Sequence, residues 1–171
     1  VSIATTTGFL TSNYSNWPLF VPILLLFTAF IGACAGSTGG GIKVIRTLVL
    51  AKQSAGEITK LIHPNAVISI KLGKKAVSPR IAESVWGFFS IYVIVFIILF
   101  MFLLAQGNDF ITSFSAVGAT LNNLGPGLGD VAHNYQSLND LSKIGLCIAM
   151  ILGRLEIFTL LVLFTPAFWR K

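Results

Sequence analysis

Three long apolar stretches divide the chain and predict membrane-spanning helices. Trp17–Ala35 and Ser84–Gln106 contain no charged side chain, and Ile144–Trp169 is apolar except for Arg154 and Glu156. A helix needs roughly 20 apolar residues to cross a bilayer, and each stretch reaches that length. The pattern therefore predicts an all-α membrane protein.

A shorter amphipathic helix is predicted between the second and third stretches. Asn108–Leu121 begins with an Asn-Asp pair suited to capping, and its apolar residues recur at helical spacing. At about 1.5 Å per residue it is too short to cross a bilayer. The segment that follows, Asn122–Asp130, is rich in Gly and Pro and cannot continue the helix. We expect a re-entrant hairpin that enters the membrane from outside.

The first residues of the chain repeat this pattern. "ATTTGF" (Ala4–Phe9) precedes the first span as "ATLNNLGPG" (Ala119–Gly127) precedes the third, which pairs Gly8 with Gly125 and Thr6-Thr7 with Asn123-Leu124. Such internal similarity indicates a repeated structural unit. We expect about one and a half copies of a helix–pore loop–helix unit, within the C-terminal part of a longer protein.

The two hairpins predict a path for a dehydrated cation. Non-helical backbone at membrane depth is tolerated only inside protein or beside water, and its carbonyl oxygens can replace the hydration shell of an ion. The short helix would direct its negative dipole end to the same place. Acidic residues of the outer region, Asp109, Asp130 and Asp140, would attract cations. The candidate ion-binding residues are Thr5, Thr6, Thr7, Gly8, Phe9, Asn122, Asn123, Leu124 and Gly125.

Composition and charge set the orientation. The chain is 54% apolar and 11% charged, against about 25% charged residues in soluble proteins. The positive-inside rule places the basic region 42–83 and the C-terminus in the cytoplasm, with the hairpins outside. This anchoring explains the net charge of +6, so nucleic acid is not an expected partner. The basic residues beside the membrane are Lys43, Arg46, Lys52, Lys60, Lys71, Lys74, Lys75, Arg80, Arg170 and Lys171.

A run of small residues interrupts the first predicted span. Backbone without side chains can approach a pore axis and change conformation at low cost, which is compatible with the gate that the resemblance described below implies. A close helix-packing face is the alternative, although packing favours small residues one turn apart. A phosphate-binding loop is excluded because Ile42 stands where that motif needs Lys. The candidate gate residues are Gly36, Ser37, Thr38, Gly39, Gly40 and Gly41.

Arg154 lies near the middle of the third predicted span. A charge there costs about 2.5–3.5 kcal/mol on insertion scales, so Arg154 must face protein or water. It either points into the pore as an electrostatic barrier or forms a structural salt bridge. Glu156 lies roughly 200° further round the helix and needs a different partner. No nucleophile is paired with a base, and His63 and His133 stand alone, so neither an enzyme nor a bound cofactor is expected.

Four motifs, in order, carry a resemblance to a known family. "ATTTGF", "GSTGGGIKVIR", "ATLNNLGPGLGD" and "GRLEIFTLLVLFTPAFWR" resemble the C-terminal half of the TrkH family. These are the membrane subunits of bacterial Trk potassium-uptake systems, in the Trk/Ktr/HKT superfamily. The resemblance implies a potassium-channel-like fold with four linked helix–pore loop–helix repeats around one pore. Residues 1–53 would end the third repeat, with an intramembrane gate loop at 36–41. Residues 54–83 would form a cytoplasmic linker and residues 84–171 the fourth repeat. Within the linker, the alternating pattern of Val67–Ser78 around Gly73 predicts a short hairpin.

The same resemblance implies a function. Potassium would pass through the carbonyl filter as transported substrate, under control of the Gly-rich loop, in a bacterial inner membrane. The implied partners are the lipid bilayer, the missing N-terminal repeats, a second copy in a homodimer and a TrkA-like cytoplasmic nucleotide-binding regulatory subunit. A sodium-permeable member of the superfamily and a non-conducting membrane interaction module are the alternatives. Symport and channel behaviour both remain open.

Overall fold

The computed structural model describes residues 1–9, 14, 17–18, 20–32, 34, 36–37, 39–63, 71–73 and 75–155. The described part is mainly helical. In chain order its elements are α1 (Phe20–Ile31), α2 (Val44–Ile62), β1 (Lys71–Leu72), β2 (Lys75–Ala76), α3 (Pro79–Ala105), α4 (Phe110–Leu121), the 3₁₀ turn η2 (Gly129–Val131) and α5 (Asp140–Arg154).

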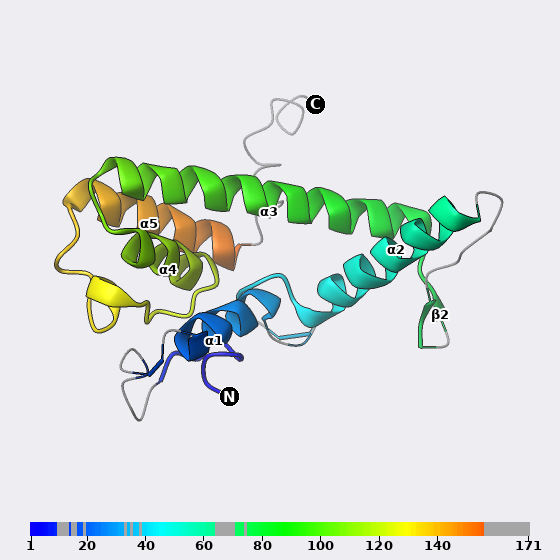
Figure 1. Cartoon of the computed structure of the whole chain (residues 1–171), viewed down its shortest axis with the longest axis horizontal. Helices are drawn as coiled ribbons and strands as arrows, with labels where there is room; N and C mark the ends of the chain where they lie inside the picture. The colour runs from blue at the N-terminus through cyan, green and yellow to red at the C-terminus, as the bar shows by residue number, and fades with distance from the viewer. Residues whose placement is uncertain are drawn as a thin grey trace, which may run out of the picture.

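Helix α3 runs along the length of the molecule and organises the rest. Helices α4 and α5 pack beside one half of it, and α2 approaches the other half (Figure 1). Pro79 lies in its first turn, where a missing N–H costs no hydrogen bond. Within the described residues, α3 is the one helix that is long and apolar enough to cross a membrane. It contains the predicted span Ser84–Gln106.

The other two predicted spans differ from expectation in their described parts. We expected a helix over Trp17–Ala35, but α1 ends at Ile31 because Gly32 adopts a left-handed φ of 73°. The next helix begins at Val44. Helix α5 begins at Asp140, earlier than the predicted span. Residues 156–171, with Glu156 and the predicted cytoplasmic C-terminus, lie outside the described residues.

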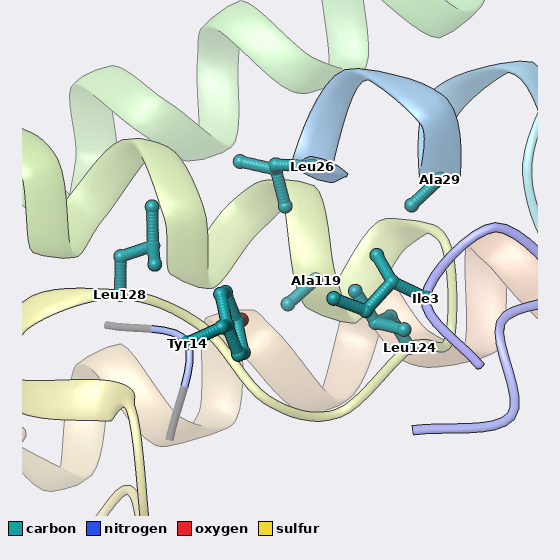
Figure 2. Packing of buried hydrophobic residues seen from close by; sticks show 7 residues of the cluster. All are labelled: Ile3, Tyr14, Leu26, Ala29, Ala119, Leu124 and Leu128. Atoms are coloured by element: carbon teal, nitrogen blue, oxygen red, sulfur yellow. The ribbon is translucent and has the colours of Figure 1, made fainter. Parts of the chain in front are cut away.

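Small residues bring the helices close together. A Cβ on Gly118 of α4 would lie 3.1 Å from the ring of Phe30 in α1, and one on Gly145 of α5 would lie 2.9 Å from the ring of Phe102 in α3. In lipid, helices associate through such van der Waals packing, because the surrounding hydrocarbon is as apolar as a side chain. A buried cluster then joins the start of the chain to α1, α4 and the segment after α4 (Figure 2). Its members are Ile3, Tyr14, Leu26, Ala29, Ala119, Leu124 and Leu128.

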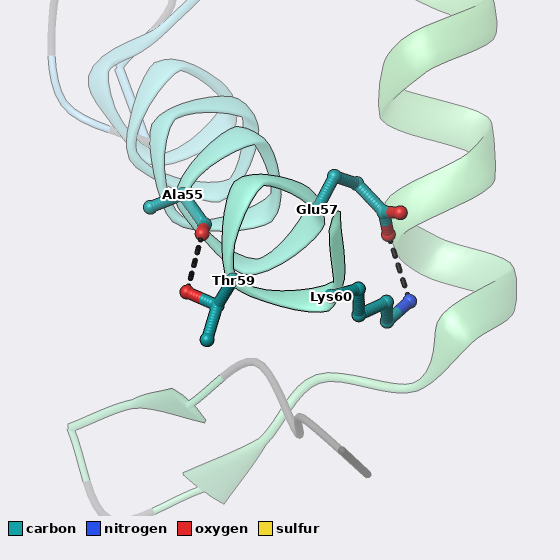
Figure 3. A network of polar contacts seen from close by, with 4 residues as sticks. All are labelled: Ala55, Glu57, Thr59 and Lys60. Carbon is teal, nitrogen blue, oxygen red and sulfur yellow. Dashed lines mark hydrogen bonds and ion pairs between the residues drawn. The ribbon is translucent and has the colours of Figure 1, made fainter. Parts of the chain in front are cut away.

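The far end of α2 and the β-hairpin form a polar region. Strands β1 and β2 pair antiparallel, with Lys71 opposite Ala76, which confirms the predicted short hairpin around Gly73. Lys52 of α2 donates to the Lys71 carbonyl (2.6 Å) and ties the hairpin to the helix. Further along α2, Lys60 pairs with Glu57 (2.8 Å), as Figure 3 shows. Helices α2 and α3 extend into the two ends of the expected linker 54–83, which is therefore helical at both ends.

Helix α4 is enclosed by its neighbours, and its prediction from sequence is confirmed. Asp109 is the N-cap and accepts a hydrogen bond from the Ile111 N–H (3.2 Å). The following segment is extended, except that the turn η2 begins at Gly129, within the stretch predicted to be non-helical. Ser115 anchors this segment to α4 through Leu128. The Ser115 Oγ accepts a hydrogen bond from the Leu128 N–H (2.8 Å) and donates one to the Leu128 carbonyl (3.1 Å).

Replacing Ser115 with Ala should destabilise the protein. Ser115→Ala leaves the N–H and the carbonyl of Leu128 without these partners in a buried place. We expect the free energy of unfolding of the full-length protein to fall by about 1–3 kcal/mol. Thermal denaturation in detergent measures the change.

Ser113→Ala is the matched control for this experiment. Ser113 lies on the same helix and is also 0% exposed, but its Oγ has no hydrogen-bond partner among the described residues. Its removal should leave stability unchanged or raise it, since an unpaired buried hydroxyl is unfavourable. Equal losses in the two variants would contradict the anchoring role of Ser115.

Candidate ion-binding site

The C-terminal end of α4 turns sharply into the second hairpin. Asn123 adopts a left-handed φ of 54°, and its N–H donates to the Thr120 carbonyl (3.0 Å). The N–H of Leu124 donates to the Ala119 carbonyl (2.8 Å). These two bonds form a Schellman motif, which ends a helix and redirects the chain. Gly125 then adopts a φ of 101°, a conformation that favours glycine.

The start of the chain has the same backbone geometry. Thr6 adopts a φ of 53°, and its N–H donates to the Ile3 carbonyl (3.1 Å). The N–H of Thr7 donates to the Ser2 carbonyl (2.9 Å), and Gly8 adopts a φ of 81°. Both hairpins therefore have the same two hydrogen bonds and the same two left-handed positions. Their register is the one in which the sequence pairs Gly8 with Gly125.

Thr6 is an unusual residue for this conformation. Left-handed φ values are rare for β-branched side chains and cost of order 1–3 kcal/mol. The strain is maintained by the two hydrogen bonds of the motif. Such strained residues cluster at functional sites, so the outlier at Thr6 supports a functional role for the hairpin.

The two hairpins are in direct contact. Gly8 lies against the carbonyl oxygen of Leu124, where a Cβ would collide with it, and a Cβ there would lie 3.4 Å from Cδ of Pro126. Ile3 and Leu124 also share the buried cluster of Figure 2. Backbone oxygens of both hairpins can therefore line a common path.

The carbonyls of the second hairpin fall into two groups. The outer carbonyls are bound by side chains: the Tyr135 hydroxyl donates to Gly125 O (2.6 Å), and the Tyr14 hydroxyl lies 2.9 Å from Gly127 O and 3.3 Å from Pro126 O. The inner carbonyls accept no hydrogen bond from any described residue. They belong to Asn122, Asn123 and Leu124. The described residues therefore leave these three oxygens without a hydrogen-bond donor, although the backbone of Gly8 lies close to the Leu124 oxygen and that of Gly40 close to the Asn122 oxygen.

Three candidate ion-binding side chains are hydrogen-bonded within the protein, and a fourth carries no oxygen. The Asn122 side chain is fully buried, accepts from the Tyr92 hydroxyl (2.8 Å) and donates to the Gly118 carbonyl (2.8 Å). The hydroxyls of Thr5 and Thr7 are hydrogen-bonded to each other (2.9 Å). The Phe9 side chain is 83% exposed and has no oxygen.

The small-residue loop folds back on the end of α1. The Ile42 N–H donates to the Phe30 carbonyl (3.0 Å), and Gly41 adopts a φ of 84°. Gly39 N–H donates to Ser37 Oγ (3.1 Å). Thr38 lies outside the described residues. This folding places Gly40 against the Asn122 carbonyl, at the inner end of the second hairpin, where a Cβ would collide with the oxygen.

A cavity of about 200 Å³ lies beside this loop. Arg154 lines it, so the structure brings this arginine to the loop residues Gly39 and Gly41. Lys43 and Arg46 also line the cavity, and the Arg46 guanidinium lies 4.3 Å from the centroid of the Phe88 ring. Three basic side chains thus line one cavity beside the loop.

Sequence reasoning missed three tyrosines that contact the hairpin or its helix. They are Tyr14, Tyr92 and Tyr135. Tyr92 could have been singled out from the sequence, because a hydroxyl within an apolar span needs a hydrogen-bond partner. The identity of the partner was not available from local sequence. Burial raises the pKa of Tyr135, as it does that of Tyr14, so both hydroxyls remain protonated donors at neutral pH.

Comparison with known proteins gives consistent matches over the whole chain. A family model described as "TrkH: Cation transport protein" matches residues 1–171. The "Trk system potassium uptake protein TrkH" of Escherichia coli K12 is 60% identical over 171 residues, which are 100% of this chain and 35% of that protein. TrkI of Halomonas elongata, another Trk system potassium uptake protein, is 36% identical over 174 residues, covering 100% of this chain and 35% of that protein.

A solved structure also matches nearly the whole chain. The crystal structure of the potassium transporter TrkH from Vibrio parahaemolyticus superimposes with a TM-score of 0.91 at 57% identity, covering 99% of this chain and 36% of that chain. The chain thus spans about a third of the length of these relatives. The relatives are transport proteins, not enzymes.

Proposed function

The chain belongs to the TrkH family of cation transport proteins, and from this premise we propose that it forms part of a potassium-uptake transporter. The main support for the proposal is that two hairpins touch at Gly8 and Leu124. Both hairpins have the same two hydrogen bonds and the same two left-handed positions. Such a pair directs inner carbonyls toward a shared path, where they can replace the water around an ion.

The proposed filter uses main-chain oxygens. In the second hairpin these are the carbonyls without partners among the described residues, at Asn122, Asn123 and Leu124. Thr5, Thr6 and Thr7 supply the matching carbonyls in the first hairpin. The C-terminal end of α4 points its negative dipole toward the same ion. A closed ring needs about four such hairpins, and the parts of longer relatives that this chain does not cover would supply the others.

Potassium is the proposed substrate. Curated relatives that match the whole chain carry potassium uptake in their names. Sodium permeation is the alternative, because the filter segments outside this chain contribute to the choice of ion. A measurement of both ions on the full-length protein separates the two.

The proposed gate is the small-residue loop at 36–41. Gly40 covers the Asn122 carbonyl, so the loop closes the inner end of the filter in this conformation. Arg154, beside the same loop, adds an electrostatic barrier to cations until the loop moves. A structural salt bridge is the competing role for Arg154.

The proposed orientation follows from the basic residues. Lys52 and Lys60 lie on α2, which extends away from α4 and the hairpins (Figure 1), and Arg80 lies in the first turn of α3. Region 42–83 and the C-terminus would then face the cytoplasm of a bacterium, with the spans in its inner membrane. The proposed partners are a second copy of the protein and a TrkA-like nucleotide-binding regulatory subunit.

Substituting the hairpin glycines should lower ion selectivity. Gly8→Ala and Gly125→Ala both place a Cβ at a left-handed φ, which costs about 1–2 kcal/mol. Gly8→Ala should be the more severe, because its Cβ also meets the Leu124 carbonyl, while a Cβ on Gly125 meets nothing within 4 Å. Uptake of K⁺ and Na⁺ by the full-length protein in proteoliposomes gives the selectivity ratio.

Gly107→Ala is the matched control for backbone strain. Gly107 has a φ of 84° and open space around it, but it lies in the turn between α3 and α4. This variant should keep the K⁺/Na⁺ ratio. An unchanged ratio in both hairpin variants would contradict the proposed function.

Displacing the loop should increase flux. Gly40→Ala forces the loop away from the Asn122 carbonyl, so we expect K⁺ flux through the full-length protein to rise. Gly36→Ala is the control, because a Cβ on Gly36 meets nothing within 4 Å. Flux assays in proteoliposomes without regulatory subunit compare the two. Equal flux in Gly40→Ala and Gly36→Ala would exclude this loop position as the gate contact.

A further inference from the structure

Two tyrosines form hydrogen bonds with the outer carbonyls of the second hairpin. One precedes this hairpin in the chain and the other follows it. Tyr14 follows the first hairpin and reaches across to the Pro126 and Gly127 carbonyls (3.3 and 2.9 Å). Tyr135 follows the second hairpin and donates to the Gly125 carbonyl at 2.6 Å. The hydrogen bond from Tyr135 is shorter than those from Tyr14. Its acceptor, Gly125, directly follows the three residues that have the inner carbonyls.

The peptide between Gly125 and Pro126 has few other restraints. Gly125 has no side chain and open space where a Cβ would lie. Pro126 has no N–H, so this peptide unit lacks the donor that would normally fix its direction. The N–H of Gly125 makes no hydrogen bond to another described residue. Within the described chain, the Tyr135 hydroxyl is the group that holds this carbonyl.

We propose that Tyr135 is a positioning residue for ion selection, acting through the Gly125 carbonyl on the oxygens of Leu124 and Asn123. This inference rests on the proposed filter function. Selectivity depends on the number and field of the carbonyls that face the ion. The proline ring fixes φ of Pro126, so a rotation of the Gly125–Pro126 peptide has to be taken up by the backbone dihedrals of Gly125, which also connect to the Leu124 carbonyl. The Tyr135 hydrogen bond prevents this rotation.

A single hydroxyl can be removed without changing the shape of the ring. Tyr135 borders a cavity of about 270 Å³, lined also by Leu146, Cys147 and Met150, so a phenylalanine ring fits the same place. Tyr135→Phe in the full-length protein should lower the K⁺/Na⁺ uptake ratio about two- to tenfold, the range expected for one hydrogen bond. Potassium uptake itself should remain measurable in the proteoliposomes.

Two comparisons make the result decisive. Gln136→Ala changes an exposed residue of the same loop and should leave the ratio unchanged. An unchanged ratio in Tyr135→Phe, together with a lower ratio in Gly125→Ala, would overturn the role of Tyr135 and leave the filter intact. Unchanged ratios in both would instead reject the filter.

A near-isosteric replacement covers the case in which Tyr135→Phe does not assemble. In 3,5-difluorotyrosine the phenol loses its proton at lower pH than in tyrosine, and a phenolate cannot donate to a carbonyl. With this residue at position 135, the K⁺/Na⁺ ratio should fall as the pH rises through that titration. The natural protein should keep its ratio over the same range, since burial raises the pKa of Tyr135.

Neighbouring titratable groups are common to both proteins. They are Tyr14, Lys143, which pairs with Asp140 at 3.2 Å, and His133, which lies two residues before Tyr135 in the chain. A difference between the pH profiles of the two proteins must therefore come from residue 135. Identical profiles would overturn the proposal.

Discussion

The structure depends on how backbone carbonyls are satisfied where α4 ends. Non-helical backbone within a membrane must find internal partners or face water. The Schellman motif at Asn123 satisfies carbonyls of the helix, and hydroxyl groups of Tyr135, Tyr14 and Ser115 occupy the outer carbonyls of the hairpin. The inner carbonyls remain, and a dehydrated cation is a partner of suitable charge for them. The short helix, the glycines and the surrounding tyrosines are all consequences of placing those oxygens.

The proposed gate and the proposed filter share a small contact region. Gly40 of the loop touches the Asn122 carbonyl, and Gly153 of α5 touches the Leu121 carbonyl, each at a place where a Cβ would collide. Tyr92 of α3 holds the Asn122 side chain from another direction. Three segments therefore converge on the last residues of α4. In the proposed mechanism, movement of the loop would change access to the filter without any change in α4, because the Asn122 side chain is held by Tyr92 and the Gly118 carbonyl.

Local sequence predicted the features that depend on local physics. The capping pair that contains Asp109, the end of α4 and the correspondence of Gly8 with Gly125 follow from capping, Gly-Pro content and repetition, and the left-handed φ of both glycines agrees with that correspondence. The hydrophobic pattern did not reveal that α1 ends at Ile31, since Gly32 and its φ carry no hydrophobic signal. The partners of the tyrosines could not be predicted either. Tyr14 and Gly127 are distant in sequence, and only the packing of α1 against α4 brings them together.

The most direct test locates the ion. Crystals of the full-length protein grown in Rb⁺ or Tl⁺ give an anomalous signal at each bound cation. The account predicts a peak between the two hairpins, beside the carbonyls of Thr7 and Leu124. A strong peak elsewhere in the membrane, with none between these hairpins, would contradict it.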